Sequence, residues 1–159
     1  FAFAFYKNSY VGRTFIKPTQ EERESSVHLK LSVLESVVKD KRIVLVDDSI
    51  VRGTTIANLI HMLKEAGAKE VHVRISSPPF LHPCYFGTDV PSNDQLIAAS
   101  HSTEEICDMI GADSLGYMQT DYLEGMAGGL PLCKACFDGN YPMEIPDYTN
   151  AEFADIVKC

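Results

Sequence analysis

The order of apolar and polar positions divides the chain into alternating strands and helices. Residues 43–46 form an aliphatic run without alternation, which predicts a parallel strand covered on both faces. Residues 56–63 place apolar side chains at the three- and four-residue spacing of an amphipathic helix, and Gly67 lies where a helix-ending glycine is expected. Residues 71–75 form another apolar-rich strand. The three segments together predict a right-handed strand–helix–strand unit with parallel strands.

Further strands and loops are predicted around this unit. Residues 1–5 alternate in character and need a sheet to pair with, and residues 27–33 show the period-two pattern of a half-buried strand. A short helix is expected over residues 35–38. Residues 76–83 contain three prolines, which do not fit inside a regular element, so they form a loop.

The second half of the chain continues the same alternation. Residues 95–99 predict a short buried strand. Ser102 and Glu105 have the spacing of a capping box, which starts a helix that Gly111 ends. Residues 114–118 are the last strand candidate. The pattern as a whole predicts an α/β fold built on a parallel sheet flanked by helices.

Composition limits the classes of protein that fit this pattern. The 159 residues suffice for one domain with a sizeable core, and 45% of them are hydrophobic. The formal net charge of −8 argues against a general nucleic-acid surface. No apolar run approaches the roughly 20 residues that span a bilayer, and the first residues lack a secretory leader. We therefore expect a cytoplasmic protein that binds small anions and neither nucleic acid nor membrane.

The strand at residues 43–46 leads into the most informative polar residues. Asp47 and Asp48 follow it directly, and Gly53, Thr54 and Thr55 precede the helix. Ligands of open α/β sheets bind beyond the carboxyl ends of strands, where a helix N-terminus offers free N–H groups to an anion. Carboxylates repel a bare phosphate but suit ribose hydroxyls or magnesium. The combination predicts a sugar-phosphate site; each half alone could be an ordinary solvated loop. The lysine of a Walker A loop is absent.

Five cysteines raise the question of metal binding. Cys133 and Cys136 have the two-residue spacing that lets both sulfurs reach one metal, and a turn follows them. Free, partly buried thiols are the alternative, and Cys84 is a third sulfur that could join. Cys107 lies among apolar helix residues and is expected in the core, while Cys159 has no assigned role.

The acid pair followed by Gly-Thr-Thr resembles the 5-phosphoribosyl pyrophosphate (PRPP) motif of type I phosphoribosyltransferases. Its flanks extend the resemblance, from about residue 7 to residue 145, to the glutamine PRPP amidotransferases (amidophosphoribosyltransferases). Four further segments carry that likeness: residues 10–16, 75–79, 82–84 and 133–136. The resemblance implies a type I phosphoribosyltransferase-like sheet with a lid loop and a C-terminal cysteine segment. Residues 1–145 would be this domain, truncated at its N-terminus, and residues 146–159 a tail.

The family also implies a role for individual residues. Asp47 and Asp48 would hold the ribose hydroxyls and Mg²⁺, and the following loop would wrap the 5′-phosphate. The residues of that loop are Ser49, Ile50, Val51, Arg52, Gly53, Thr54 and Thr55. Residues 7–26 would form the lid, with Arg13 and Lys30 neutralising the departing pyrophosphate; such closure excludes water and supplies positive charge. Without the family likeness, both cations would be ordinary surface residues.

One branch of the family implies a 4Fe-4S cluster on Cys84, Cys133 and Cys136, with the fourth cysteine outside this chain. Zinc on three sulfurs with water or a histidine is the alternative. The glutaminase of the family begins with a cysteine nucleophile, whereas residue 1 here is Phe, so glutamine hydrolysis is not assigned to these residues.

The implied activity is phosphoribosyl transfer from PRPP to ammonia, supplied by glutamine in the complete enzyme. The products are 5-phosphoribosylamine and pyrophosphate, in the first committed step of purine synthesis. Purine nucleotides are expected inhibitors, and the complete enzyme is expected to be a homo-oligomer. Two other classes fit the residues: a non-catalytic sensor that binds PRPP or a nucleotide, and a metal-binding structural module.

Overall fold

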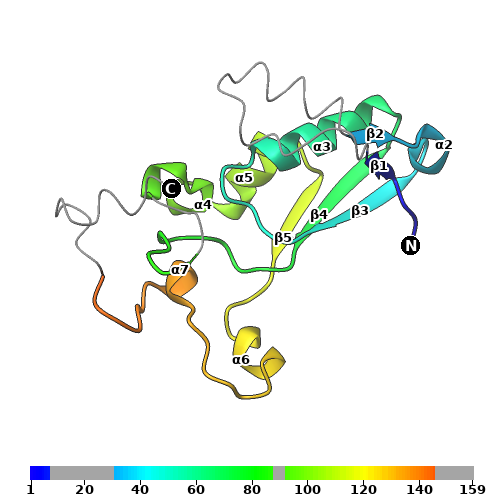
Figure 1. Cartoon of the computed structure of the whole chain (residues 1–159). Helices are drawn as coiled ribbons and strands as arrows, with labels where there is room; N and C mark the ends of the chain where they lie inside the picture. Colours follow the sequence, from blue (N-terminus) through cyan, green and yellow to red (C-terminus); the bar gives the residue numbers. More distant parts are fainter. Residues whose placement is uncertain (8–30, 88–91, 146–159) are drawn as a thin grey trace.

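The structure is a computed structural model that describes residues 1–7, 31–87 and 92–145. Its centre is a sheet of three parallel strands in the order β3 (Arg42–Asp47), β4 (Glu70–Ile75) and β5 (Ser114–Tyr117). Helix α3 (Thr54–Glu65) connects β3 to β4, and α5 (Thr103–Ile110) precedes β5, as Figure 1 shows. The predicted parallel α/β architecture is confirmed.

One face of this sheet carries the hydrophobic core. Val71, Val73 and Ile75 of β4 all point to that face and are at most 3% exposed. The apolar side of α3, with Ile60 and Leu63, packs on them, and α5 adds a further apolar surface. The rest of this buried cluster comes from Val38, Ile50, Ile56, Ile106 and Ile110. Alternate residues of each strand therefore bind the two helices to one side of the sheet.

The opposite face of the sheet is exposed on β3. Val44 and Val46 are 63% and 66% exposed, although their neighbours in the strand are partly buried. The prediction of a strand covered on both faces is therefore wrong for the described residues. The aliphatic run has no alternation in its sequence, but α3 and α5 cover only one of its two faces.

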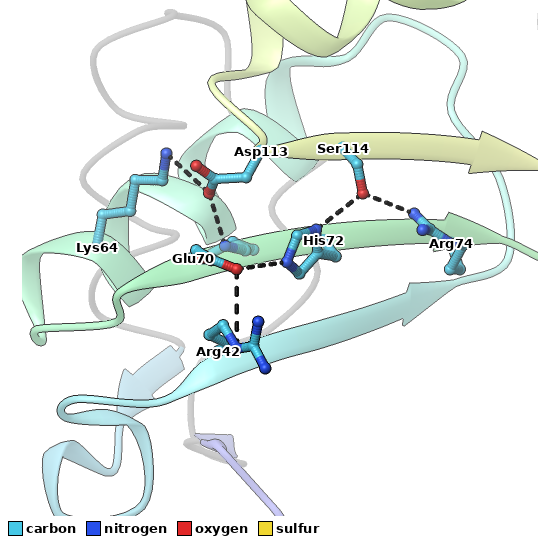
Figure 2. Close-up of polar contacts among 8 residues, drawn as sticks. Arg42, Lys64, Glu70, His72, Arg74, Asp113 and Ser114 are labelled. Atoms are coloured by element: carbon cyan, nitrogen blue, oxygen red, sulfur yellow. Dashed lines mark hydrogen bonds and ion pairs between the residues drawn. The ribbon is translucent and has the colours of Figure 1, made fainter.

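Polar side chains continue this open face across β4 and β5 (Figure 2). Glu70 accepts a hydrogen bond from His72 at 2.9 Å and lies 3.9 Å from Arg42. The other ring nitrogen of His72 is 2.9 Å from the Ser114 hydroxyl, to which Arg74 also donates at 3.1 Å. The network ties the three strands together laterally on the side that no described helix covers.

Local capping explains where α5 begins and ends. The Ser102 hydroxyl accepts the N–H of Glu105 at 3.2 Å, and the Glu105 carboxylate accepts the N–H of Ser102 at 2.7 Å. Gly111 then stops the helix with a φ of 71°. The predicted capping box is confirmed. Its backbone hydrogen bond lowers the pKa of Glu105.

The segment before α5 differs from the prediction. Instead of a buried strand over residues 95–99, it forms a 3₁₀ turn, η2 (Asn93–Gln95), and a short helix, α4 (Ile97–Ser100). A short apolar run does not by itself distinguish a strand from a helical turn. Leu96 between the two turns is 1% exposed, so the segment is anchored to the core without joining the sheet.

The remaining elements lie around the sheet. Strands β1 (Phe5–Lys7) and β2 (Leu31–Val33) form a separate antiparallel pair, followed by α2 (Glu35–Val38). Beyond β5, the chain forms α6 (Tyr122–Met126) and α7 (Ala135–Asp138). Figure 1 shows α6 standing apart from the sheet and its helices. Within the described ranges, no helix has the length and apolar character needed to cross a membrane.

Candidate functional site

The two acidic residues lie where β3 ends and the loop toward α3 begins. Asp47 is the last residue of β3 and is partly buried, whereas Asp48 is exposed. The Asp47 carboxylate accepts the N–H of Asp48 at 2.9 Å, and the Asp48 carboxylate accepts the Ser49 hydroxyl at 3.1 Å. Among the residues that the structure describes, neither carboxylate forms an ion pair. Both carboxylates are therefore available to a cation or to hydroxyl groups.

The electrostatics of Asp47 fit a site that binds a cation. Burial raises the pKa of Asp47, and the adjacent Asp48 carboxylate raises it further, while the Asp48 N–H opposes the shift. A carboxylate that has lost water without gaining a positive partner is destabilised in its charged form. A divalent cation beside both acids would reverse this penalty.

The helix end that faces this loop is built for an anion. Gly53 is the N-terminal cap of α3 with a φ of 81°, and in the part of the chain that the structure describes no side chain caps the N–H groups of the first turn. Thr54 and Thr55 of that turn are exposed. The left-handed φ favours glycine, and a Cβ at this position would lie 3.1 Å from Ile97 Cδ1, a tight contact with the end of a side chain. The unpaired amides and the helix dipole together favour a phosphate group.

Residues from two other segments hold the loop in place. The carbonyl of Val51 accepts the N–H of Ile97 at 2.9 Å, and Arg52 donates to the side chain of Gln95. At the start of the loop, the Asp47 carbonyl accepts both the N–H of Ser76, at 3.0 Å, and its hydroxyl, at 3.2 Å. These supports were not predicted from the sequence, because they depend on contacts between distant segments. Ile50 anchors the loop in the core, with 2% of its surface exposed.

The cysteine segment forms a second polar region, at α7. The carbonyl of Cys136 accepts the N–H groups of Leu81 and His82, at 2.9 and 3.0 Å, which joins α7 to the loop that carries Cys84. Burial raises the pKa of the Cys136 thiol to about 11, and the nearby Cys84 and Cys133 sulfurs add to the shift. The three cysteines therefore share one region.

These cysteines do not form a ready metal site. In the described ranges, no three His, Cys, Asp or Glu side chains come together closely enough to hold a metal ion. Cys133 is exposed, whereas Cys136 is partly buried. Cys107, expected in the core, is partly buried on α5, and its thiol donates to the Ala112 carbonyl at 3.3 Å.

Comparison with known proteins shows which proteins carry a loop similar to this one. Residues 6–76 match the phosphoribosyl transferase domain model, which includes the acid pair, Gly53 and all of α3. The chain is 53% identical over 148 residues to the amidophosphoribosyltransferase of Bacillus subtilis, and 57% identical over 136 residues to that of Pyrococcus horikoshii. The chain is therefore similar to one part of the amidophosphoribosyltransferases.

Solved structures of that family share the fold. The glutamine PRPP amidotransferase of B. subtilis, complexed with ADP and GMP, matches with a TM-score of 0.79 and 49% identity over 96% of this chain. A structure described as the allosteric regulatory enzyme of purine biosynthesis matches with a TM-score of 0.76 and 48% identity. The type I phosphoribosyltransferase fold predicted from the acid pair is thereby confirmed.

The chain corresponds to only part of these amidophosphoribosyltransferases. It spans 30% of the length of the B. subtilis and P. horikoshii relatives, and 35% of the B. subtilis solved chain. The matched region covers 87% and 86% of the present chain, respectively. Arg13 and Lys30, the cations implied for pyrophosphate, lie outside the described residues, as do residues 8–26 of the lid segment. Their roles stay predictions.

Proposed function

We propose that this chain supplies the PRPP site of an amidophosphoribosyltransferase. The complete protein would displace pyrophosphate from C1 of PRPP with ammonia from glutamine and form 5-phosphoribosylamine. The observation that carries the proposal is the junction of β3 and α3. There, two carboxylates without an ion pair and a helix N-terminus without a side-chain cap, as judged among the described residues, flank one loop. A sugar carrying both hydroxyls and phosphate is the ligand class that needs both features.

Each part of the loop then has a distinct task. Asp47 and Asp48 would accept hydrogen bonds from the ribose hydroxyls and hold Mg²⁺. The partly buried Asp47 carboxylate and the exposed Asp48 carboxylate, which form no ion pair among the described residues, fit this role. Bound there, Mg²⁺ would neutralise charge on the pyrophosphate group. The N–H groups from Gly53 to Thr55 would bind the 5′-phosphate. Ser76 and Ile97 would keep both ends of the loop in register by their hydrogen bonds to its backbone.

The remaining positive charge would come from Arg13 and Lys30, as the family likeness implies. Pyrophosphate leaves as an anion from a ribosyl centre that becomes positively charged, so fixed cations beside the leaving group lower the barrier. Purine nucleotides are proposed inhibitors, supported by the ADP and GMP bound in the B. subtilis relative. We propose a cytoplasmic location and a homo-oligomeric complete enzyme as well.

We further propose that the cysteine segment binds metal in the complete protein, as a 4Fe-4S cluster. Cys84, Cys133 and Cys136 share one region, but they do not form a three-ligand group, so the cluster would require them to close together around a fourth sulfur from outside this chain. Iron and labile-sulfide analysis of the anaerobically purified complete protein tests this. Zinc in place of iron and sulfide would support the three-sulfur alternative.

Replacement of the two carboxylates in the complete protein tests the main proposal. Asp47→Asn and Asp48→Asn should each reduce PRPP-dependent pyrophosphate release by about 100-fold, the scale found when one electrostatic group is removed from an active site. Asp40→Asn is the matched control, because Asp40 is exposed just before the opposite end of β3. Unchanged PRPP binding and turnover in the first two variants would disprove the assignment. PRPP binding without turnover in the unmodified protein would favour a sensor.

A further inference from the structure

Residues 121–133, between β5 and α7, form what we call the apolar arm. The arm contains α6, turns at Gly128 and Gly129, and returns to Cys133. None of its residues is buried, and only Leu123 and Ala127 are even partly buried. Figure 1 shows α6 standing clear of the sheet. The arm therefore gains little from the core described above.

The arm exposes a concentration of large apolar side chains. Tyr122 and Met126 are four residues apart on α6 and so share one side of it, with 59% and 72% of their surfaces exposed. Leu130 and Leu132 follow on the returning limb, at 67% and 44%. Single exposed apolar residues are common on protein surfaces, but four within eleven consecutive positions mark a surface that binds something. A helix of five residues also needs outside contacts to persist.

The shape of the arm is set by polar contacts within it and with Lys134, the residue that follows it. The ammonium group of Lys134 lies 2.7 Å from the Glu124 carboxylate, and this ion pair joins α6 to the returning limb. The Gly129 N–H donates to the Glu124 carbonyl at 3.1 Å, which closes the turn. Polar groups thus fix the hairpin internally, and its apolar side chains are left for another surface.

We propose that the apolar arm packs against a part of the same polypeptide that lies outside these 159 residues. The chain makes up 30% of the curated relatives and 35% of the solved relative, so most of such a polypeptide lies elsewhere. A second copy fits less well, since four side chains fall far short of the roughly 20–30 residues a side that stable interfaces use. An intrachain contact avoids the entropy cost of association.

Site-specific photo-crosslinking in the complete protein tests the proposal. The crosslinking residue p-benzoylphenylalanine replaces Met126, and the control replaces Met109, which is 56% exposed on α5. We expect Met126→p-benzoylphenylalanine to give a crosslink within one chain, to a peptide outside residues 1–159, identified by mass spectrometry. A crosslink to a second chain, a crosslink within residues 1–159, or a yield no higher than at position 109 would overturn the proposal.

A charge substitution gives an independent readout. Met126→Glu in the complete protein should speed hydrogen exchange of residues 121–133 at least 10-fold, while Met109→Glu leaves them unchanged. Equal exchange in both variants and the parent would overturn the proposal. PRPP turnover is measured on the same samples. An arm that crosslinks as expected in a protein that does not use PRPP would refute the proposed function alone, and the reverse result would refute the docking alone.

Discussion

Gly53 offers a direct test of how the loop proposed to bind PRPP is built. Its φ of 81° lies in the left-handed region, where a residue with a Cβ loses about 1–2 kcal/mol. A Cβ would also lie 3.1 Å from Ile97 Cδ1 and 3.6 Å from Ile110 Cγ2. The first distance is shorter than the optimum of about 3.5–4.0 Å for carbon atoms. Gly53→Ala therefore adds crowding to backbone strain.

The free-energy cost of this crowding depends on whether the neighbouring side chain can move. Overpacking costs about 1–3 kcal/mol, and the low end applies because Ile97 Cδ1 is the tip of a side chain that can rotate. Gly53→Ala should then cost about 2–3 kcal/mol. Gly111→Ala is the matched control: its φ of 71° carries the same strain, but nothing lies within 4 Å of its Cβ position. Its cost should be only about 1–2 kcal/mol.

Hydrogen exchange of the complete protein separates the cost of backbone strain from the cost of crowding. The first turn of α3 in Gly53→Ala should open about five- to tenfold more than the last turn of α5 in Gly111→Ala, the equivalent of about 1 kcal/mol. The KM for PRPP should rise only in Gly53→Ala, because Ile97 also donates to the loop carbonyl of Val51. Equal effects of both variants on exchange and on KM would refute the argument that this loop is packed around a glycine.

Three further predictions concern single polar groups of the described residues. Because burial raises the pKa of Asp47, the folded chain holds a proton that the unfolded chain has lost, so stability without ligand should fall as pH rises from about 4 through that pKa. Asp47→Asn should flatten this slope in thermal unfolding; an unchanged slope would contradict it. Asp113→Ala should lose about 1 kcal/mol at neutral pH, since the carboxylate accepts the Val71 N–H at 2.7 Å and Lys64 at 3.3 Å (Figure 2). These contacts lower the pKa of Asp113, so the loss should shrink as acid protonates the parent carboxylate, and a loss constant to pH 2 would be inconsistent. Tyr117→Phe should gain about 1 kcal/mol, because the hydroxyl is buried without a hydrogen-bond partner among the described residues. Burial also raises the pKa of Tyr117 to about 12. In an ultraviolet titration, Tyr117→Phe should therefore remove the tyrosine that ionises at the highest pH, and removal of one that ionises near pH 10 would count against this.

Helices and strands were predictable from the sequence where their apolar residues repeat regularly and nearby residues mark where the element begins or ends. Helix α5 is the best case, because its capping box and Gly111 act within a few residues and match the observed bounds. Strand β4 and helix α3 likewise follow from the spacing of their apolar residues. Residues 95–99 lacked such ends, and their short apolar run was compatible with either a strand or the helical turns that form.

The candidate site was predictable in its chemistry but not in its support. The acid pair and the Gly-Thr-Thr turn are contiguous, so their relation to the strand and helix follows from order alone. The partners that fix the loop are distant in sequence: Gln95 lies 43 residues beyond Arg52, and Ile97 and Ser76 belong to other elements. No local pattern reveals which of many polar residues will meet the loop after folding.

The exposed face of β3 links the fold to the question of what this chain does by itself. Parallel sheets are normally covered on both faces, and a strand with aliphatic residues on both sides is typical of a sheet with a packing layer on each face. Val44 and Val46, at 63% and 66% exposure, are instead directed away from the described helices. Asp47 is the last residue of the same strand, so a segment that packed on these valines would also affect the position of the Asp47 carboxylate. The proposed PRPP site therefore lies at the end of a strand whose second face is uncovered among the described residues.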